Sequence, residues 1–326
     1  MRVLVTHNPE DLDAYYGRAL PRLQQIADVV VNPFDRDLST TELIDAAAGC
    51  HVIAAHRVTP GATELFTALP DLLAFLRCAV DVSTIDVDAA SASGVLVARA
   101  DKSFVASTAE LALGLFLDVS RQIASSTVDY RDGREPPQRP GRQVRGQTAG
   151  IIGFGAIGSY LADLLAALGL DVLVSDPNVE SPFEDVDLDG LLGRSDVVFP
   201  LAPGNEATTG LIGADQLAAM RDGAVLVNVS RGELLDEAAV AAALDSGRLS
   251  GVGLDVGQAA DQRPSALLAG RPDVVATPHL GGLTPENADA QAASSVEQVD
   301  AMIRGEIPPR SVNADDATRL RSWWAR

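Results

Sequence analysis

The sequence predicts an α/β protein that contains two doubly wound parallel sheets. Short apolar runs alternate with helical patterns along the chain, as expected for parallel strands joined by helices. The alternation stops once, over residues 131–147, and starts again at Ala149. The chain has 326 residues, of which 47% are hydrophobic. That length and composition suffice for about two domains with buried cores.

The first series of apolar runs predicts a parallel sheet with helices between its strands. Its strands are expected at Val3–Thr6, Asp28–Val31, Val52–Ala55, Ala74–Cys78 and Val95–Val97. One of the intervening helices opens after Thr40-Thr41-Glu42. A long helical pattern runs from Ser107 to Ile123, and we expect a Ser-Thr cap to begin it. Residues 131–147 then carry Arg, Pro, Gly and Gln, which predicts a solvated loop.

The second series predicts another parallel sheet and a final helix. Its strands are expected at Gly150–Ile152, Val172–Ser175, Val197–Phe199, Ala224–Asn228, Gly251–Asp255 and Val274–Ala276. The final helix is expected from about Pro285 to Arg304. Two doubly wound units in one chain favour a functional cleft between them, at the carboxyl ends of the strands.

Charge and cysteine content limit the class of partner. The formal net charge is −20 at pH 7, so repulsion disfavours nucleic acid and anionic membranes as partners. Lys102 is the only lysine, so arginine must supply nearly all the positive charge for a small anionic substrate. Cys50 and Cys78 form no paired motif, which indicates a reducing compartment. No segment resembles a signal peptide or a membrane span, so we expect a cytoplasmic protein.

A glycine-rich turn follows the apolar run that begins at Ala149. The turn consists of Gly153, Phe154, Gly155, Ala156, Ile157 and Gly158. In this GxGxxG pattern the first glycine permits a tight turn, and the second lets the backbone approach a pyrophosphate. The third lets the following helix pack against the strand. Because phosphates bind the free N–H groups at the positive end of a helix, the pattern predicts a dinucleotide site.

An acidic residue closes the next strand of this unit. Asp176 follows the strand at Val172–Ser175, close to the spacing of about 20 residues expected for an adenosine-ribose acid. A carboxylate there accepts hydrogen bonds from a free 2′-hydroxyl and repels a 2′-phosphate. The sequence therefore predicts NAD as the cofactor rather than NADP. The alternative is an ordinary glycine-rich turn followed by an exposed Asp.

Five segments carry a more specific pattern. They are Gly146–Gly153 (GQTAGIIG), Leu226–Gly232 (LVNVSRG), Leu235–Glu237 (LDE), Leu254–Val256 (LDV) and Thr277–Gly282 (TPHLGG). In this order they resemble the D-2-hydroxyacid dehydrogenase family, whose relatives include phosphoglycerate, formate and phosphite dehydrogenases and NAD-binding corepressors. Weaker likeness at residues 85–90, 107–110 and 304–308 extends the resemblance over nearly the whole chain.

The resemblance implies how the chain divides into domains. Residues 1–100 and 285–326 would form a flavodoxin-like substrate domain, and residues 101–284 an NAD-binding Rossmann domain inserted into it. The family typically dimerises through the inserted domain, so a homodimer is expected. The closing segment with Trp323 and Trp324 would pack either on the substrate domain or on a partner subunit.

The resemblance also implies the roles of individual residues. Arg231 matches the position that binds the substrate carboxylate, and a guanidinium can do so with two parallel hydrogen bonds. His279 matches the proton donor and acceptor, a role that suits imidazole. Asp255 is expected near the nicotinamide. Other residues expected along the cofactor are Thr108, Pro203, Val229 and Ser230. The alternatives are an Arg231 that pairs within its loop and a His279 that is structural, as we expect for His7 and His51.

One departure from the family concerns the partner of the histidine. Most members carry a glutamate five residues after the Asp of the Leu-Asp-Val motif, where this chain has Ala260. Asp261 or Gln258 could replace it, and loss of an orienting carboxylate can cost several orders of magnitude in rate. Two hypotheses stay open. The first is an NAD-dependent dehydrogenase that acts on a small 2-hydroxy or 2-keto acid of D configuration. The second is an NAD-binding regulatory protein with weak or no catalysis.

A second departure concerns the substrate loops. Asp81 occupies a position where the family usually has glycine, and Val80 one where phosphite dehydrogenases carry lysine. A carboxylate beside an anionic substrate costs about 1 to 4 kcal/mol at 4 Å. We therefore expect Asp81 to pair with Arg57 or to recognise a polar or cationic substrate. His56, Arg57, Val80 and Asp81 are expected to contact the substrate together with Arg231.

Overall fold

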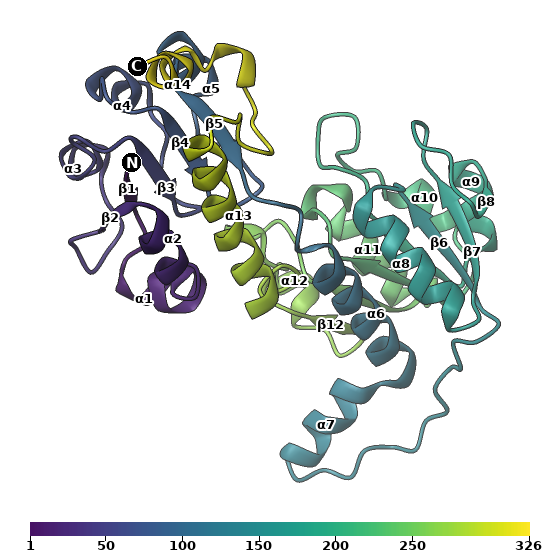
Figure 1. The fold of residues 1–326 in the computed structure, drawn as a ribbon. Helices are drawn as coiled ribbons and strands as arrows, with labels where there is room; N and C mark the ends of the chain where they lie inside the picture. The colour runs from purple at the N-terminus through teal and green to yellow at the C-terminus, as the bar shows by residue number, and fades with distance from the viewer. The chain divides into compact units, whose positions relative to one another are not determined.

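The computed structural model describes residues 1–326 and divides the chain into two compact units. Unit 1 contains residues 1–103 and 285–326, and unit 2 contains residues 104–284. Each unit is built around its own parallel sheet with helices on both faces (Figure 1). This confirms the predicted fold class of two doubly wound parallel sheets.

The sheet of unit 1 has the strand order β2-β1-β3-β4-β5, and all neighbours are parallel. Its strands are β1 (Arg2–Val5), β2 (Asp28–Val31), β3 (Val52–Ala55), β4 (Ala74–Arg77) and β5 (Leu96–Arg99). This is the strand order of flavodoxin-like sheets. Each strand lies within two residues of its predicted run, because short apolar runs between polar turns mark buried parallel strands clearly.

The helical segments of unit 1 come from both ends of the chain. They are α1 (Pro9–Asp11), a π-helical turn (Leu12–Tyr16), α2 (Leu20–Ile26), α3 (Thr40–Ala46), α4 (Thr63–Ala68), α5 (Val87–Ala92), α13 (Pro285–Ile303), a 3₁₀ turn (Ala314–Asp316) and α14 (Thr318–Trp324). α3 begins at Thr40 because Ser39 and Glu42 form a capping box. α13 ends within one residue of the predicted position.

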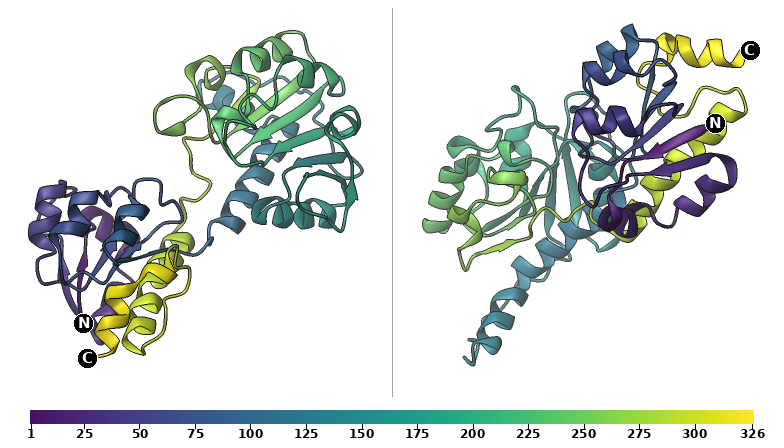
Figure 2. Two further views of the ribbon diagram at one scale, coloured as in Figure 1. Left: turned by 90° about the horizontal axis from the view of Figure 1, so that it is seen from above. Right: turned by 90° about the vertical axis from the view of Figure 1, so that its left-hand side faces the viewer.

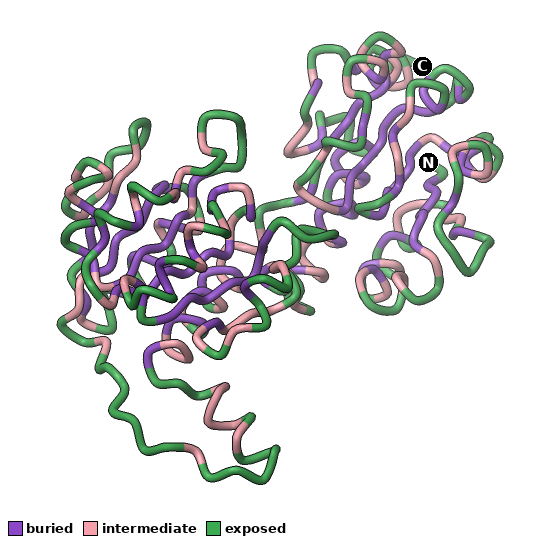
Figure 3. Tube along the Cα trace, turned by 180° about the vertical axis from the view of Figure 1, so that it is seen from behind, coloured by how far each residue is buried: buried purple, intermediate pink, exposed green.

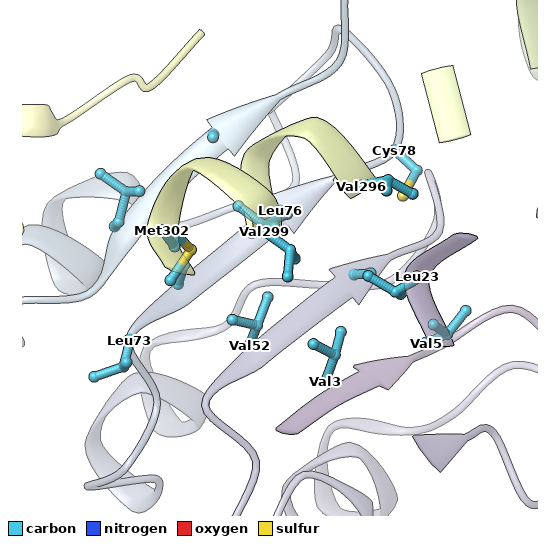
Figure 4. Packing of buried hydrophobic residues seen from close by; sticks show 14 of the residues in the cluster. Val3, Val5, Leu23, Val52, Leu73, Leu76, Cys78, Val296, Val299 and Met302 are labelled. Atoms are coloured by element: carbon cyan, nitrogen blue, oxygen red, sulfur yellow. The ribbon is translucent and has the colours of Figure 1, made fainter. Parts of the chain in front are cut away.

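Successive side chains of the unit 1 strands point to opposite faces of the sheet. Val3 and Val5 face a core that also contains residues of α2, α13 and α14, whereas Leu4 faces the core beneath α3, α4 and α5. Figure 4 shows Val296 and Val299 of α13 packed over the strands of the first core.

The C-terminal segment packs on unit 1. Trp323 and Trp324 lie against the core that contains α13, and the Trp324 Nε1 donates a hydrogen bond to the Met302 carbonyl at 2.8 Å. The ring of His51 contacts the ring of Trp323 at a centroid distance of 6.3 Å. Of the two alternatives that the sequence left open for these tryptophans, the structure shows the first.

The sheet of unit 2 has the order β12-β11-β10-β9-β6-β7-β8, again with parallel neighbours. Its strands are β6 (Thr148–Ile152), β7 (Asp171–Ser175), β8 (Glu184–Asp185), β9 (Val197–Pro200), β10 (Ala224–Asn228), β11 (Leu249–Leu254) and β12 (Val274–Ala276). The order reverses between β6 and β9, as in Rossmann sheets. β8 was not predicted, because its two exposed acidic residues carry no apolar signal.

Helices cover both faces of the unit 2 sheet. The helical segments are α6 (Val105–Arg121), α7 (Ile123–Arg131), α8 (Ala156–Ala167), α9 (Leu188–Arg194), α10 (Ala214–Ala219), a 3₁₀ turn (Gly232–Leu234), α11 (Glu237–Asp245), a 3₁₀ turn (Ala260–Gln262) and α12 (Ala266–Ala269). Residues of α6 and α8 share one core, and residues of α9 to α12 share the other. None of the helices in the chain combines the length and apolarity that crossing a bilayer requires.

The structure corrects the prediction for α6. This helix begins at Val105, and Ser107 lies inside its first turn, where its hydroxyl donates to the Phe104 carbonyl at 3.0 Å. The predicted Ser-Thr cap is therefore wrong. α6 ends at Arg121 because Gln122 adopts a left-handed conformation with φ 55°, and α7 follows, which the sequence pattern did not predict.

α7 and residues 132–147 form an arm that projects from the sheet of unit 2 (Figure 2). α7 contains no buried residue, and the loop after it is exposed almost throughout (Figure 3). The loop agrees with the solvated segment predicted from its Arg, Pro and Gly content.

Candidate active site

The glycine turn lies at the carboxyl end of β6, beside β9. Gly153 has φ 96°, and a Cβ there would lie 2.8 Å from the backbone nitrogen of Ala202. A Cβ at Gly158 would collide with the carbonyl oxygen of Gly153. The packing of the chain itself therefore requires glycine at both positions, the first for its backbone conformation and close approach, the second for helix–strand contact.

Gly155 differs from the other two glycines of the turn. It is the N-cap residue of α8, it is exposed, and a Cβ there would meet no other atom of the chain within 4 Å. Nothing in the packing of the protein explains this glycine. The space in front of it lies at the N-terminus of a twelve-residue helix, where free N–H groups and the helix dipole favour an anion. The turn therefore fits a pyrophosphate.

The middle of the turn is fixed by Phe154 and Asp176. The Phe154 ring is buried and meets the Phe183 ring edge-on at 6.2 Å. Asp176, directly after β7, accepts a hydrogen bond from the Phe154 N–H at 2.7 Å through Oδ2. Its Oδ1 accepts hydrogen bonds from the backbone of Asn178 and Val179. Hydrogen bonds thus join the predicted ribose acid to the glycine turn, and the carboxylate retains one lone pair, on Oδ2, for a 2′-hydroxyl.

The turn after β10 carries Arg231. Buried Asn228 accepts a hydrogen bond from the Ser230 N–H at 3.0 Å and donates one to the Arg231 carbonyl at 2.8 Å. The Ser230 hydroxyl donates to the Ala202 carbonyl at 2.9 Å, which joins this turn to the one after β9. Val229 is buried between these residues.

Most N–H donors of the Arg231 guanidinium form no hydrogen bond within the chain. Its side chain is exposed, forms no ion pair, and donates only from Nη1 to the Ser230 carbonyl at 2.8 Å. The stem of Arg231 lies so close to Gly204 that a Cβ at that glycine would be 2.9 Å from the Arg231 Cγ. Pro203 is exposed beside it. The aliphatic part of the Arg231 side chain is therefore held in place, while its guanidinium can bind an anionic ligand.

Asp255 anchors the loop after β12. Its carboxylate is fully buried and accepts three hydrogen bonds. The donors are the Thr277 hydroxyl at 2.7 Å, the Leu280 N–H at 2.7 Å and the Gly281 N–H at 2.8 Å. A Cβ at Gly281 would lie 3.0 Å from Asp255 and 3.2 Å from Thr108. The glycine therefore lets this loop approach both the Asp255 carboxylate and α6, the helix that carries Thr108. The expected contact between Asp255 and the nicotinamide stays a prediction.

This loop carries His279 in an exposed position. His279 has a left-handed φ of 62°, its own N–H donates to the Thr277 carbonyl at 3.0 Å, and the N–H of the next residue, Leu280, donates to Asp255. Its Nδ1 lies 3.2 Å from the main-chain carbonyl oxygen of Asp261. Because a carbonyl oxygen can only accept, Nδ1 is the donor, and Nε2 of the neutral imidazole carries the lone pair.

A tight loop presents the Asp261 carbonyl. Asp261 and Gln262 both have left-handed backbone conformations, with φ of 58° and 57°. The Gly257 N–H donates to the Gln262 carbonyl at 2.9 Å, and the Ala259 N–H to the Arg263 carbonyl at 3.1 Å. The side-chain amide of Gln258 donates to the Leu235 carbonyl at 3.0 Å and so is engaged away from His279. The partner of His279 is the backbone of Asp261, not its carboxylate.

The residues predicted to bind substrate lie on two loops of unit 1. His56 follows β3 and is buried, whereas Arg57 is exposed. Val80 and Asp81 lie beyond β4, and Asp81 accepts hydrogen bonds from the backbone and hydroxyl of Ser83 at 2.9 and 2.8 Å. The predicted pairing of Asp81 with Arg57 stays a prediction.

Arg77, which was not predicted from the sequence, holds both loops. Its side chain is 1% exposed and donates to the carbonyls of His56 and Thr59 and to the Thr84 hydroxyl. Burial lowers the pKa of Arg77 to about 10, opposed by Cys78 and Asp81, so the guanidinium remains charged at neutral pH. An arginine that ends the apolar strand Ala-Phe-Leu-Arg was the signal that could have identified it.

The fold of unit 2 and its glycine turn define a dinucleotide-binding protein of the Rossmann class. The family model described as D-isomer specific 2-hydroxyacid dehydrogenase, NAD binding domain, matches residues 113–281. The chain belongs to this family, and its cofactor is NAD.

Individual proteins that are similar to this chain include two dehydrogenases or reductases and one solved structure. D-3-phosphoglycerate dehydrogenase of Mycobacterium leprae (strain TN) is 36% identical over 282 residues, which are 84% of this chain and 53% of that relative. The chain thus spans about half the length of this relative. Hydroxypyruvate reductase of Thermotoga maritima is 33% identical over 274 residues, covering 82% of this chain and 88% of the relative. The crystal structure of the TT0316 protein from Thermus thermophilus matches with a TM-score of 0.83 and 30% identity, covering 96% of this chain and 100% of that one.

Proposed function

We propose that the chain is an NAD-dependent dehydrogenase that interconverts a small 2-hydroxy acid of D configuration and its 2-keto acid. The observation that carries this proposal is the His279 imidazole, held through Nδ1 with Nε2 unoccupied, in the same unit as the NAD-binding turn. When bound, NADH supplies the hydride that reduces C2 of the keto acid.

The cofactor contacts follow from the glycine turn and Asp176. In this proposal the N–H groups at Gly155 and Ala156 bind the pyrophosphate, and Asp176 accepts hydrogen bonds from the adenosine ribose. Thr108, Pro203, Val229 and Ser230 lie beside the cofactor, and Asp255 positions the loop that carries His279. The space at Gly155 and the carboxylate of Asp176 support the assignment.

Arg231 binds and polarises the substrate. Its guanidinium donates two parallel hydrogen bonds to an oxygen pair, as in other arginine–carboxylate contacts. The absence of an internal ion pair leaves these donors for the substrate, and fixed charge next to a developing alkoxide stabilises the transition state.

His279 moves the proton. In the direction of reduction, the imidazolium donates the proton on Nε2 to the substrate oxygen as C2 receives hydride. In oxidation, Nε2 of the neutral imidazole removes the hydroxyl proton. The Asp261 carbonyl fixes the ring and its tautomer through Nδ1, the task that a glutamate performs in most of the family, and the Asp261 carboxylate takes no part.

The two loops of unit 1 select the substrate in this proposal. One carries His56 and Arg57, and the other carries Val80 and Asp81. Arg57 is exposed and supplies positive charge in a strongly acidic chain. The two relatives named above act, by their names, on phosphoglycerate and hydroxypyruvate, so small 2-keto acids of three carbons are the first substrates to test.

We also propose that the protein is a homodimer. The arm of α7 and residues 132–147 exposes Ile123, Val128 and Tyr130, with exposed fractions of 55%, 50% and 69%. A helix without buried residues of its own is explained if a second copy covers it. Analytical ultracentrifugation of the Val128→Glu variant tests this proposal. A monomer is expected where wild type is a dimer, and a monomeric wild type would contradict it.

Steady-state NADH oxidation with a panel of 2-keto acids tests the proposed activity. The panel contains pyruvate, hydroxypyruvate, glyoxylate and 3-phosphohydroxypyruvate, and Arg231→Ala and His279→Ala serve as matched controls. Wild type is expected to turn over at least one substrate, with a loss of about 100-fold or more in each variant. Tight NADH binding without turnover would instead support the NAD-binding regulatory protein.

A further inference from the structure

Three metal-ligating side chains meet at one edge of the unit 1 sheet. Asp11 follows β1, Asp37 follows β2 and His56 follows β3, and these strands are neighbours in the order β2-β1-β3. All three residues lie beyond the carboxyl ends of their strands, the edge at which parallel sheets bind ligands. One ligand atom from each residue lies within 4.8 Å of those from the other two.

The His56 ring is fixed in one orientation. It stacks on Tyr15 with centroids 6.0 Å apart and contacts the His7 ring at 4.8 Å. Its backbone N–H donates to the Thr6 hydroxyl at 2.9 Å. The side chain is only 8% exposed, yet its Nδ1 has no hydrogen-bond partner. A buried polar atom without a partner needs an explanation, and a bound ion is one that would complete its bonding.

The Nδ1 of His56 faces two carboxylates at distances that do not suit hydrogen bonds. It lies 3.5 Å from the Asp11 Oδ2 and 4.0 Å from the Asp37 Oδ1. An N–H···O hydrogen bond spans about 2.7 to 3.2 Å. Two atoms bound to one metal ion at about 2.0 to 2.2 Å each are about 3 to 4 Å apart. Both distances from the His56 Nδ1 therefore suit a shared ion, and because the three ligand atoms lie within 4.8 Å of one another, shifts of a few tenths of an ångström bring all three onto it.

We propose that Asp11, Asp37 and His56 bind a divalent transition-metal cation. Its two positive charges offset the two carboxylates, and it gives the His56 Nδ1 its missing partner. Nitrogen from imidazole together with carboxylate oxygen suits Zn²⁺, Mn²⁺ and Co²⁺, whereas Mg²⁺ and Ca²⁺ prefer oxygen alone. Asp37 is 56% exposed, so water or a ligand oxygen can complete the coordination on that side.

Neighbouring side chains hold the two acids in place, as in metal sites with an ordered outer shell. The Asn8 amide donates to the Asp11 Oδ2 at 2.7 Å and accepts from the Asp11 N–H at 3.0 Å. Buried Asn32 donates to the Arg36 carbonyl at 2.9 Å, directly before Asp37. Asn8 and Asn32, which are not among the three proposed ligands, therefore help to fix the positions of Asp11 and Asp37.

Titration of the untagged, chelator-treated full chain with Zn²⁺ in a calorimeter tests the proposal. Wild type is expected to bind one ion per chain, and Asp37→Asn and His56→Gln to bind it at least about tenfold more weakly. Asp35→Asn and His51→Gln make the same chemical changes at sites outside the cluster and are expected to bind as wild type does.

Co²⁺ absorption provides a second readout that is independent of affinity. Wild type is expected to show visible bands that Asp37→Asn alters, and because Asp37 is exposed this variant is expected to fold even if His56→Gln does not. The proposal is overturned if wild type binds no stoichiometric Zn²⁺, or if binding and Co²⁺ bands are the same in wild type and in the folded cluster variants.

Discussion

The Nδ1 of His279 lies 3.2 Å from the main-chain carbonyl oxygen of Asp261. From the resemblance to the family we expect a glutamate five residues after the Asp of the Leu-Asp-Val motif, a position that Ala260 occupies in this chain. A carbonyl can orient the ring and fix its tautomer, but unlike a carboxylate it carries no net charge and cannot titrate. In the mechanism that we propose, the chain thus keeps an acceptor that orients the histidine ring, without the negative charge that a glutamate would supply.

Ala260→Glu is expected to supply that negative charge. A carboxylate near His279 favours the imidazolium, which is the form that donates the proton during reduction. Reduction of the 2-keto acid is therefore expected to persist to a pH roughly one unit higher in the variant than in wild type. The pH profile of kcat/KM for NADH-dependent reduction measures this shift.

Ala259→Glu is the matched control for this experiment. It adds the same charge at the neighbouring exposed alanine, and its profile is expected to coincide with that of wild type. Coincident pH profiles for Ala260→Glu and wild type would contradict the prediction and show that a side chain at position 260 does not reach His279.

Asp255→Asn is expected to lower kcat by about 10- to 100-fold, because an amide cannot accept three hydrogen bonds in place of the carboxylate. Its NH₂ group would face an N–H of Leu280 or Gly281, and the loop that carries His279 would move. NADH affinity, measured by fluorescence titration, is expected to change less than kcat. Asp215→Asn, an exposed acid of α10, is the control, and a kcat for Asp255→Asn equal to that of the control would contradict this role.

Asp176→Asn is expected to reduce the preference for NADH over NADPH by about tenfold, which corresponds to about 1.4 kcal/mol. The amide oxygen can accept from the Phe154 N–H or from the backbone of Asn178 and Val179 but not from both, so the affinity for both cofactors is expected to fall, and the charge that repels a 2′-phosphate is lost. Ratios of kcat/KM for the two cofactors measure the change, and Asp189→Asn on α9 is the control. An unchanged ratio of kcat/KM values would show that the 2′-position of the bound cofactor's adenosine ribose does not lie beside Asp176.

Most of the fold was predictable because parallel strands buried on both faces leave continuous apolar runs in the sequence. β1 to β5 appear within two residues of those runs. The start of α6 was misplaced because Ser107 resembles a cap while its hydroxyl bonds to the preceding turn. α7 was missed because its residues form no apolar stripe, and none of them is buried.

The site was predictable as far as side-chain motifs specify it. The glycines, Asp176, Arg231 and His279 could all be named from the sequence. The partner of His279 could not be predicted, because any residue has a carbonyl and only the left-handed backbone of Asp261 and Gln262 directs this one to the ring. Arg77 was also missed, although an arginine at the end of the apolar strand β4 was a signal that could have identified it.

Both thiols are expected to resist modification in the native protein. Burial raises the pKa of Cys78 to about 12, an effect that Ser295 and Arg77 only partly oppose, and burial also raises the pKa of Cys50. Both thiols therefore stay protonated at neutral pH, and the thiolate is the reactive form. A thiol-reactive chromogenic disulfide should label neither cysteine in native protein and both in guanidinium chloride. Rapid labelling of native protein would contradict the burial of these side chains.

Transfer of deuterium from NADH that carries deuterium at both hydrogen positions of nicotinamide C4 tests the proposed chemistry most directly. Mass spectrometry and chiral chromatography of the product are expected to show deuterium at C2 of a D-2-hydroxy acid formed from pyruvate or hydroxypyruvate. His279→Ala should form this product at least about 100-fold more slowly. A chain that binds NADH but forms no labelled hydroxy acid from any 2-keto acid would contradict the account.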